Sequence, residues 1–169
     1  MAIIKKTGQQ KLLISDFQID TDLEIMFPDE YISNISERIR LYKELNEIIS
    51  EEDLCSFEKR LIDRFGNIPQ PAQSLLDIVR IKWIAIKIGI EKILLKNDLL
   101  IAYFISDPDS QFYRSSLFVS IMNYVNRKPK QMNMKQKASK LSLTINEVKS
   151  VKTAIRILKE ILEDYEKSA

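Results

Sequence analysis

One stretch of this chain limits its fold more than any other, a run of apolar side chains between Pro71 and Gly89. Proline is favoured in the first turn of a helix and glycine just after the last, so the run predicts a single helix. Its apolar positions go round most of the helix circumference: Leu75, Leu76, Ile78, Val79, Ile81, Trp83, Ile84, Ile86 and Ile88. A helix of this kind must be covered on several sides, which predicts a central helix with Trp83 in the core.

The N-terminal region alternates between apolar and polar side chains. Residues 1–16 lack this pattern and predict a flexible tail or linker. One face of the next segment carries Phe17, Ile19, Leu23, Ile25 and Phe27, and the other carries Gln18, Asp20, Asp22 and Glu24. The alternation predicts a strand over 17–27, ended by Pro28, which lies at a sheet edge and is kept soluble by its carboxylates.

Two amphipathic helices are predicted between this strand and the central helix. The first has Asn34 or Ser36 as its N-cap. The second starts at Ser50 and ends at Gly66, where we expect a left-handed C-terminal cap. The predicted buried faces are Ile35, Ile39, Tyr42, Leu45 and Ile49 in the first helix and Leu54, Phe57, Leu61 and Phe65 in the second.

The C-terminal half alternates hairpins and helices. Strands at 92–96 and 99–105 flank the tight-turn signal Asn97-Asp98. A helix over 112–125, a second hairpin of 131–134 and 141–145, and a last helix capped by Asn146 follow. The chain is therefore expected to be α+β, with an N-terminal strand, a helical N-terminal lobe and then a small antiparallel sheet with two helices. We expect one two-lobed domain over 17–169, with lobes at about 34–89 and 90–166.

The composition excludes several kinds of chemistry. The chain has no histidine, one cysteine (Cys55) and three glycines. This excludes a Ser-His or Cys-His nucleophile pair, a structural zinc site and a glycine-rich phosphate loop. Carboxylate or lysine and arginine chemistry is left, and so is a binding module. We favour the binding module and predict no catalytic, cofactor-binding or metal-binding residue in this chain. A single cysteine and the lack of a signal-peptide pattern indicate a protein of the cytoplasm without a membrane segment.

Charged side chains in two helical motifs are candidates for contact with a partner. The first motif contains Arg38, Arg40 and Lys43, which form either a docking patch or a solvated face over Tyr42 and Ile39. The second motif runs over 63–69, and its Asp63 and Arg64 either pair with neighbours or contact a partner. Four other residues of these motifs are expected to have a structural role and not to contact a partner: Tyr42, Phe65, Gly66 and Pro69.

The net charge of +2 hides a polarised distribution. Every charged side chain from Leu12 through Glu37 is acidic, whereas the segment 127–140 is purely basic. With Tyr113 and Tyr124 nearby, this segment could follow a nucleic-acid backbone, but a hairpin protected by lysines has the same pattern. Its basic residues are Arg127, Lys128, Lys130, Lys135, Lys137 and Lys140.

An ordered series of motifs resembles the C-terminal domain of the bacterial transcription-repair coupling factor. The resemblance covers about residues 19–95 and depends on the order and spacing of five segments: Phe27–Ile32, Arg38–Lys43, Leu61–Pro69, Leu75–Ile78 and Lys87–Ile90. It implies that this chain is part of a larger ATP-driven translocase of double-stranded DNA. Such a parent dislodges stalled RNA polymerase and recruits nucleotide excision repair.

The resemblance also implies what this domain does. It would be a non-catalytic autoinhibitory clamp that packs on the N-terminal repair-recruitment module and hides the surface for the damage-recognition subunit. ATP and magnesium would bind in the motor domains and not in this chain. On this hypothesis Arg38, Arg40, Lys43, Asp63 and Arg64 are the candidate interdomain contacts. The alternative hypothesis is a nucleic-acid-binding module that uses the segment 127–140.

Overall fold

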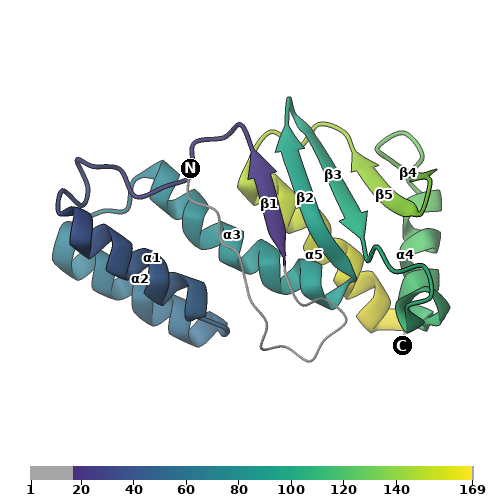
Figure 1. Cartoon of the computed structure of the whole chain (residues 1–169), viewed down its shortest axis with the longest axis horizontal. Coiled ribbons are helices and arrows are strands. Elements are labelled where there is room, and N and C mark those ends of the chain that lie inside the picture. Colours follow the sequence, from purple (N-terminus) through teal and green to yellow (C-terminus); the bar gives the residue numbers. More distant parts are fainter. Residues whose placement is uncertain (1–16, 169) are drawn as a thin grey trace.

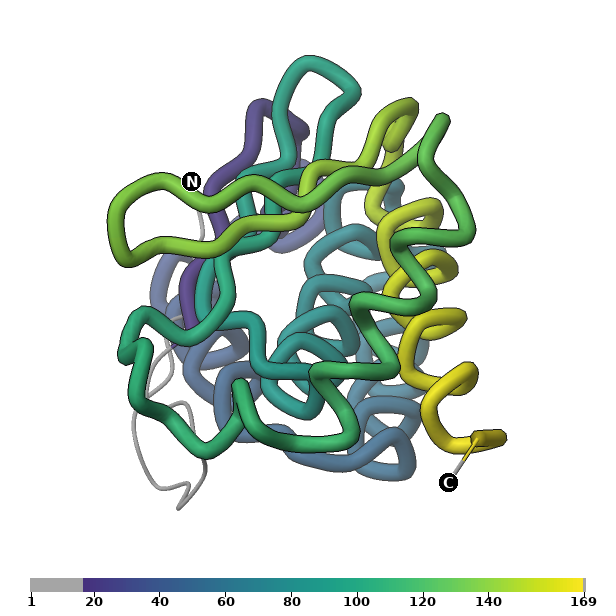
Figure 2. The backbone as a smooth tube through the Cα atoms, turned by 90° about the vertical axis from the view of Figure 1, so that its right-hand side faces the viewer, coloured from purple at the N-terminus to yellow at the C-terminus, as the bar shows by residue number. Residues whose placement is uncertain are grey.

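The computed structural model describes residues 17–168, and the expected tail at 1–16 lies outside them. A five-stranded sheet forms one layer, with the helices behind it and at its left-hand end (Figure 1). Turned by 90°, the fold shows α3, α4 and α5 on the same side of the sheet (Figure 2). The elements are β1 (Gln18–Thr21), α1 (Ile35–Glu47), α2 (Glu51–Phe65), α3 (Gln70–Lys87), β2 (Ile90–Lys96), β3 (Leu99–Phe104), the 3-10 helix η1 (Gln111–Arg114), α4 (Ser116–Asn126), β4 (Met132–Lys137), β5 (Lys140–Ile145) and α5 (Val151–Ser168).

The predicted central helix is α3, and its central place is confirmed. Eleven of its 18 residues are buried, and the helix contacts α5, β2 and α1. The core therefore lies between the sheet and α3 and α5. Trp83 packs against this core with part of its ring exposed, and its indole Nε1 is buried without a hydrogen-bond acceptor among residues 17–168.

The sheet has the strand order β1-β2-β3-β5-β4 and contains both predicted hairpins. Asn97 and Asp98 have positive φ angles of 53° and 60°, as a type I′ turn requires. The sheet is mixed instead of purely antiparallel, because β1 pairs with β2 in parallel and places Ile19 opposite Ile93. β1 lies at one edge of the sheet, as predicted.

The first strand is shorter than predicted, since β1 ends at Thr21 and not at Phe27. The Thr21 hydroxyl donates to the Leu95 carbonyl oxygen at 2.6 Å and accepts from the Leu23 amide at 3.1 Å, which turns the chain away from the sheet. The predicted alternation of burial still continues through Ile25 and Phe27. Ile25 and Phe27 are buried in the core although they lie beyond the end of β1. Alternating burial in this segment therefore does not indicate pairing with a neighbouring strand.

The predicted buried face of the first helix is partly wrong. Ile35 and Ile39 are 65% and 51% exposed, and Ile49, which lies beyond the end of α1, is 77% exposed. Leu45 is buried as predicted and Tyr42 packs against the core, but the second fully buried position is Leu41, which was not predicted. The helix turns these leucines toward the core and thereby exposes the row that begins at Ile35. Its N-cap is Asn34, whose Oδ1 accepts from the Glu37 amide at 2.9 Å.

Two helix boundaries in the C-terminal half also differ from the prediction. The expected helix over 112–125 is divided at Ser115, whose Oγ accepts from the Phe118 amide at 3.2 Å and starts α4. The last helix starts at Val151 and not at Asn146, because Glu147 has a φ of 59°, which is incompatible with a continuing helix. Ser150 Oγ accepts from the Thr153 amide at 3.1 Å and so acts as the cap.

Candidate interaction surface

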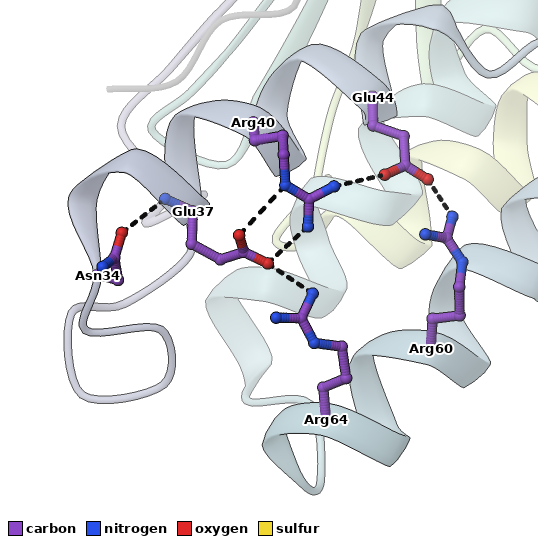
Figure 3. Close-up of polar contacts among 6 residues, drawn as sticks. All are labelled: Asn34, Glu37, Arg40, Glu44, Arg60 and Arg64. Atoms are coloured by element: carbon purple, nitrogen blue, oxygen red, sulfur yellow. Dashed lines mark hydrogen bonds and ion pairs between the residues drawn. The ribbon is translucent and has the colours of Figure 1, made fainter.

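Helices α1 and α2 bring together charged side chains that are far apart in the sequence (Figure 3). Ser50 Oγ accepts from the Asp53 amide at 3.1 Å and so fixes the start of α2, as predicted. Arg40 on α1 and Arg64 on α2 both reach Glu37, although Glu37 and Arg64 are 27 residues apart. We call the charged side chains of this face the α1–α2 surface: Glu37, Arg40, Lys43, Glu44, Arg60, Asp63 and Arg64.

Two arginines share the Glu37 carboxylate. Its Oε1 accepts from Arg40 Nη2 at 2.6 Å and from Arg64 Nη1 at 2.5 Å, and its Oε2 accepts from Arg40 Nε at 3.2 Å. The hydrogen bonds from Arg40, and to a smaller extent the one from Arg64, lower the pKa of Glu37 to about 2. Glu37 is therefore ionised at every physiological pH, and both arginines have an internal partner.

A second carboxylate extends this network along the two helices. Glu44 pairs with Arg60, and Arg40 Nη1 lies 3.8 Å from Glu44 Oε1. The side chains of Arg40, Arg60 and Arg64 are each about half exposed. The network therefore lies at the surface, where its guanidinium groups keep further N–H donors available for a partner's carboxylates.

The five predicted contact residues do not have equivalent positions. Arg38 is largely buried, with Nη1 donating to the Ile32 carbonyl oxygen at 2.6 Å and lying 3.2 Å from Asp29 Oδ1. Lys43 and Asp63 are exposed and make no ion pair or hydrogen bond within residues 17–168. Arg38 thus holds the preceding loop, while Lys43, Asp63, Arg40 and Arg64 face outward.

A shallow depression lies beside the two arginines that share Glu37. Its volume is about 410 Å³, and Arg40, Arg64 and Glu37 form its charged side. The remaining lining comes from the loop before α1, the start of α1 and the end of α2: Tyr31, Ile32, Ser33, Asn34, Ser36 and Phe65. A protruding side chain of a partner would meet the guanidinium groups there.

The motif at the end of α2 is held by an aromatic contact and by backbone hydrogen bonds. The rings of Tyr31 and Phe65 lie 5.8 Å apart, and the Arg64 guanidinium lies 4.9 Å from the centre of the Phe65 ring. The Tyr31 hydroxyl donates to the Gly66 carbonyl oxygen at 2.9 Å. Gly66 has a positive φ of 86°, but its ψ of −164° lies outside the left-handed helical region that we expected for the cap.

Two further motif residues shape the chain on either side of the surface. The Tyr42 hydroxyl accepts from the Phe27 amide at 2.8 Å and joins α1 to the segment after β1. Pro69 immediately precedes α3, and its carbonyl oxygen accepts from the Gln73 amide at 2.9 Å. The positions of these residues therefore set how α1 and α3 follow the preceding segments.

The basic segment 127–140 separates into two parts. Arg127 Nη2 lies 2.8 Å from Asp164 Oδ1, and both Arg127 and Lys128 lie over the Tyr124 ring. The Tyr113 hydroxyl donates to the Ile105 carbonyl oxygen, so Tyr113 and Tyr124 serve internal contacts. The other basic residues are exposed and make no ion pair within residues 17–168: Lys130, Lys135, Lys137 and Lys140.

Between Phe17 and Ser168 no three histidine, cysteine, aspartate or glutamate side chains gather to hold a metal ion. No helix in the same range combines the length and apolar character that crossing a membrane requires.

The family model described as "TRCF domain" matches residues 21–115, more than half of the chain. The chain belongs to this family. The match includes the whole α1–α2 surface and α3, and it extends beyond the segment 19–95 in which the sequence motifs resembled the family.

The curated relatives agree with the family. A transcription-repair-coupling factor of Escherichia coli (strain K12) is 35% identical over 92 residues, and one of Rickettsia prowazekii (strain Madrid E) is 30% identical over 117 residues. These matches cover 52% and 69% of this chain but only 8% and 10% of the relatives. This chain thus spans about a tenth of the length of the proteins it matches. It corresponds to a domain of a DNA-repair factor.

A solved structure shows the same fold. The crystal structure of a C-terminal domain of transcription-repair coupling factor superposes with a TM-score of 0.71 and covers 98% of both chains. At 18% identity this likeness concerns the fold alone. It confirms the α+β fold class, including the region after residue 95 that matched no motif.

Sequence reasoning missed three members of the α1–α2 surface. Glu37, Glu44 and Arg60 were not singled out, although Glu37, Arg40 and Glu44 follow the three- and four-residue spacing of ion pairs on a helix. That spacing could have identified the acidic residues. The involvement of Arg60 and Arg64 could not be found in this way, because it depends on how α2 lies beside α1.

Proposed function

We propose that this TRCF domain is a non-catalytic regulatory domain that restrains a larger DNA translocase by packing on its N-terminal repair-recruitment module. In this proposal the parent protein works in the bacterial cytoplasm, where it binds RNA polymerase, DNA and the damage-recognition subunit of excision repair. The ATP and magnesium that drive translocation bind in the motor domains. This chain acts through an interface that opens when polymerase is engaged.

The observation that carries this proposal is the ionic arrangement of the α1–α2 surface. Arg40 and Arg64 share Glu37, while Lys43 and Asp63 are free of ion pairs within residues 17–168. A partner's carboxylate can bind the arginines beside Glu37, and on release they keep that internal partner. Neither state then contains an unpaired arginine, which suits an interface that must open reversibly.

The surface also has the character of a reversible contact between domains. Interfaces within a chain are usually polar and moderate in area, and weak enough for a competing partner to displace them. The exposed charges of α1 and α2 fit this description. Arg38 does not, because its guanidinium is already bound to Ile32 and Asp29, so we now assign the contact to Arg40, Lys43, Asp63 and Arg64.

The test is charge reversal at the two free side chains in the full-length parent protein. Lys43→Glu and Asp63→Lys break no hydrogen bond or ion pair within residues 17–168, so the domain should keep its stability. If the surface restrains the parent, both variants should raise ATP hydrolysis without polymerase and increase binding of the damage-recognition subunit. The matched control is Lys152→Glu, at an exposed position on α5.

The two measurements separate the possible failures. Unchanged hydrolysis and unchanged binding in both variants, with unfolding curves equal to the parental curve, would exclude the α1–α2 surface as the contact. An equal increase in the Lys152→Glu control would show that the effect comes from overall charge and not from this surface. Deletion of the whole domain gives the maximum increase against which each variant is scaled.

A further inference from the structure

The sheet has one face that the helices do not cover (Figure 1). Successive side chains of a strand point to opposite faces, and the buried set, such as Ile93, Ala102 and Leu143, points toward the helices. The alternate set is half-buried or exposed and forms the outer face. On β2 to β5 its members are Lys92, Leu94, Lys96, Leu99, Ile101, Tyr103, Asn133, Lys135, Lys137, Lys140, Ser142 and Thr144.

This outer face is rich in lysine. Its positions on β2 to β5 include five lysines, and the one acidic residue of these strands is Glu91, which is half-buried at the bulge between Ile90 and Lys92. On β1 the face adds Asp20, whose carboxylate lies 3.0 Å from the Lys96 ammonium and neutralises it. Because the net charge of the whole chain is only +2, the face is distinctly more positive than the rest of the protein.

A tyrosine lies at the centre of this positive face. The pairing register places Tyr103 on β3 directly between Lys92 on β2 and Ser142 on β5, and Lys135 on β4 is opposite Ser142. The Tyr103 ring is half-buried, and its hydroxyl makes no hydrogen bond within residues 17–168. Neighbouring strands lie about 5 Å apart, so Lys92 and Lys135 stand on either side of the ring at about 5 and 10 Å.

Protection of sheet edges does not explain these residues. Lysines on the edge strand β4 could prevent unwanted strand pairing, but Lys92 lies on the interior strand β2. Lys137 is directly opposite Lys140, and like charges facing each other across two strands destabilise a hairpin. Folding alone therefore disfavours part of this arrangement, and a polyanion bound to the face would reverse the effect.

We propose that the outer face of the sheet binds single-stranded nucleic acid. An unpaired base stacks on the Tyr103 ring, while Lys92, Lys135, Lys137 and Lys140 contact the phosphates on either side. A flat sheet reaches bases only where they are not paired, and an aromatic side chain among lysines is the usual means of binding them. The proposal replaces the predicted segment 127–140 with a surface built from four strands, and it does not rest on the regulatory function proposed above.

The direct test measures binding of a fluorescein-labelled oligothymidylate of about 16 nucleotides to the 169-residue chain by fluorescence anisotropy. Binding is expected at about 50 mM NaCl and should weaken steeply as salt rises. With four lysines at phosphates, the slope of log K against log salt should be about −3. No binding at low salt would overturn the proposal.

Two sets of variants separate stacking from general charge attraction. Tyr103→Ala should weaken binding by at least about fivefold, whereas Tyr103→Phe keeps the ring and should bind as the parent does. The double variant Lys135→Glu/Lys137→Glu should abolish binding. The matched control is the double variant Lys152→Glu/Lys159→Glu on α5, which makes the same change of charge and should leave binding intact. Circular dichroism of each variant verifies its fold.

Competition experiments with unlabelled polymers show which kind of ligand the face binds. A duplex of the same sequence should compete poorly, and so should poly-glutamate of equal charge, because neither offers an unpaired base. If the duplex binds equally well and Tyr103→Ala has no effect, the face attracts phosphates without stacking and the proposal fails. If poly-glutamate competes as well as the oligonucleotide, the face is a surface for acidic polypeptides, which also overturns it.

Discussion

Gly89 and Gly66 both have positive φ angles, but their surroundings differ. Gly66 has a φ of 86° with open space where a Cβ would lie, so Gly66→Ala meets only a torsional penalty of about 1–3 kcal/mol. Gly89 has a φ of 81°, and its Cβ would lie 2.4 Å from the Phe112 ring. Because of this overpacking, we expect Gly89→Ala to lower the free energy of unfolding by about 1–3 kcal/mol in addition to the torsional penalty. Urea unfolding measures the difference.

A double-mutant cycle checks the cause at Gly89. Phe112→Leu relieves the collision, so part of the loss in Gly89→Ala should disappear in the double variant. The same change should add independently to Gly66→Ala, which has no contact with the ring. Equal losses in both glycine variants, without coupling to Phe112, would contradict the packing argument.

Glu37 should make the stability of the domain depend on pH. The Arg40 and Arg64 hydrogen bonds lower its folded-state pKa from 4.5 to about 2. A depressed pKa means that the unfolded chain binds the proton more readily, so the stabilisation is complete above about pH 4.5 and is lost as the pH falls toward 2. Glu37→Gln should therefore flatten the dependence of the unfolding free energy on pH in this range.

Salt supplies the control for the Glu37 prediction. The network lies at the surface, so its contribution is screened by ions. The difference between the parental chain and Glu37→Gln should shrink in about 1 M NaCl. A pH dependence that is identical in both chains at low salt would show that the two arginines do not stabilise the carboxylate.

At the scale of elements, local signals predicted the β2–β3 turn and the start of α2, but not the start of α5 or the conformation of Gly66. Asn97-Asp98 forms the predicted type I′ turn, and Ser50 caps α2, because in each case the determining groups lie within a few residues. The length of β1 was not predictable in this way, since it depends on the hydrogen bond from Thr21 to Leu95. The exposed row on α1 likewise depends on which side of that helix meets the core.

The β2–β3 turn offers a test of this local determination. Asp98 has a φ of 60°, where glycine is free of strain, so Asp98→Gly should stabilise the domain by about 0.5–1 kcal/mol. Asp98→Ala should destabilise it, because alanine does not favour this conformation. The Val148 amide donates to the Asp98 carbonyl oxygen, a backbone contact that both variants retain. Thermal unfolding measures both, and the same sign of change in both would exclude the torsional explanation.

At the scale of the whole molecule, Arg80 joins α2 to the central helix α3. From α3 it contacts Asp77 at 2.8 Å and Glu51 on α2 at 2.6 Å. The Asp77 side chain is only 7% exposed, so removing Arg80 leaves a buried carboxylate without its charge partner. Arg80→Met should lower the unfolding free energy by about 3 kcal/mol and speed hydrogen exchange in α2.

The matched control for Arg80 is Arg156→Met on α5. Arg156 also has a carboxylate partner, Glu160 at 2.9 Å, but its side chain is 59% exposed. An exposed pair of this kind contributes less than about 1 kcal/mol. If both variants lose the same stability, burial of Asp77 is not what makes Arg80 important.

The candidate surface shows how far sequence reasoning reached. Arg40 and Arg64 were identified as charged members of recognisable motifs, and the structure places them on one carboxylate. Arg38 belongs to the same motif but is directed inward to the Ile32 carbonyl oxygen. A motif identifies which residues are unusual, but the direction of each side chain depends on how the helix packs.

The sequence by itself determined the family, the α+β class, the central helix and both hairpins, because helical periodicity, turn residues and ordered motifs are local properties of the chain. Only the tertiary structure decided the parallel pairing of β1 with β2, the sharing of Glu37 by two helices and the row that joins Lys92, Tyr103 and Lys135. These features unite residues that are far apart in sequence. Their geometry follows from packing and strand register, which no local pattern specifies.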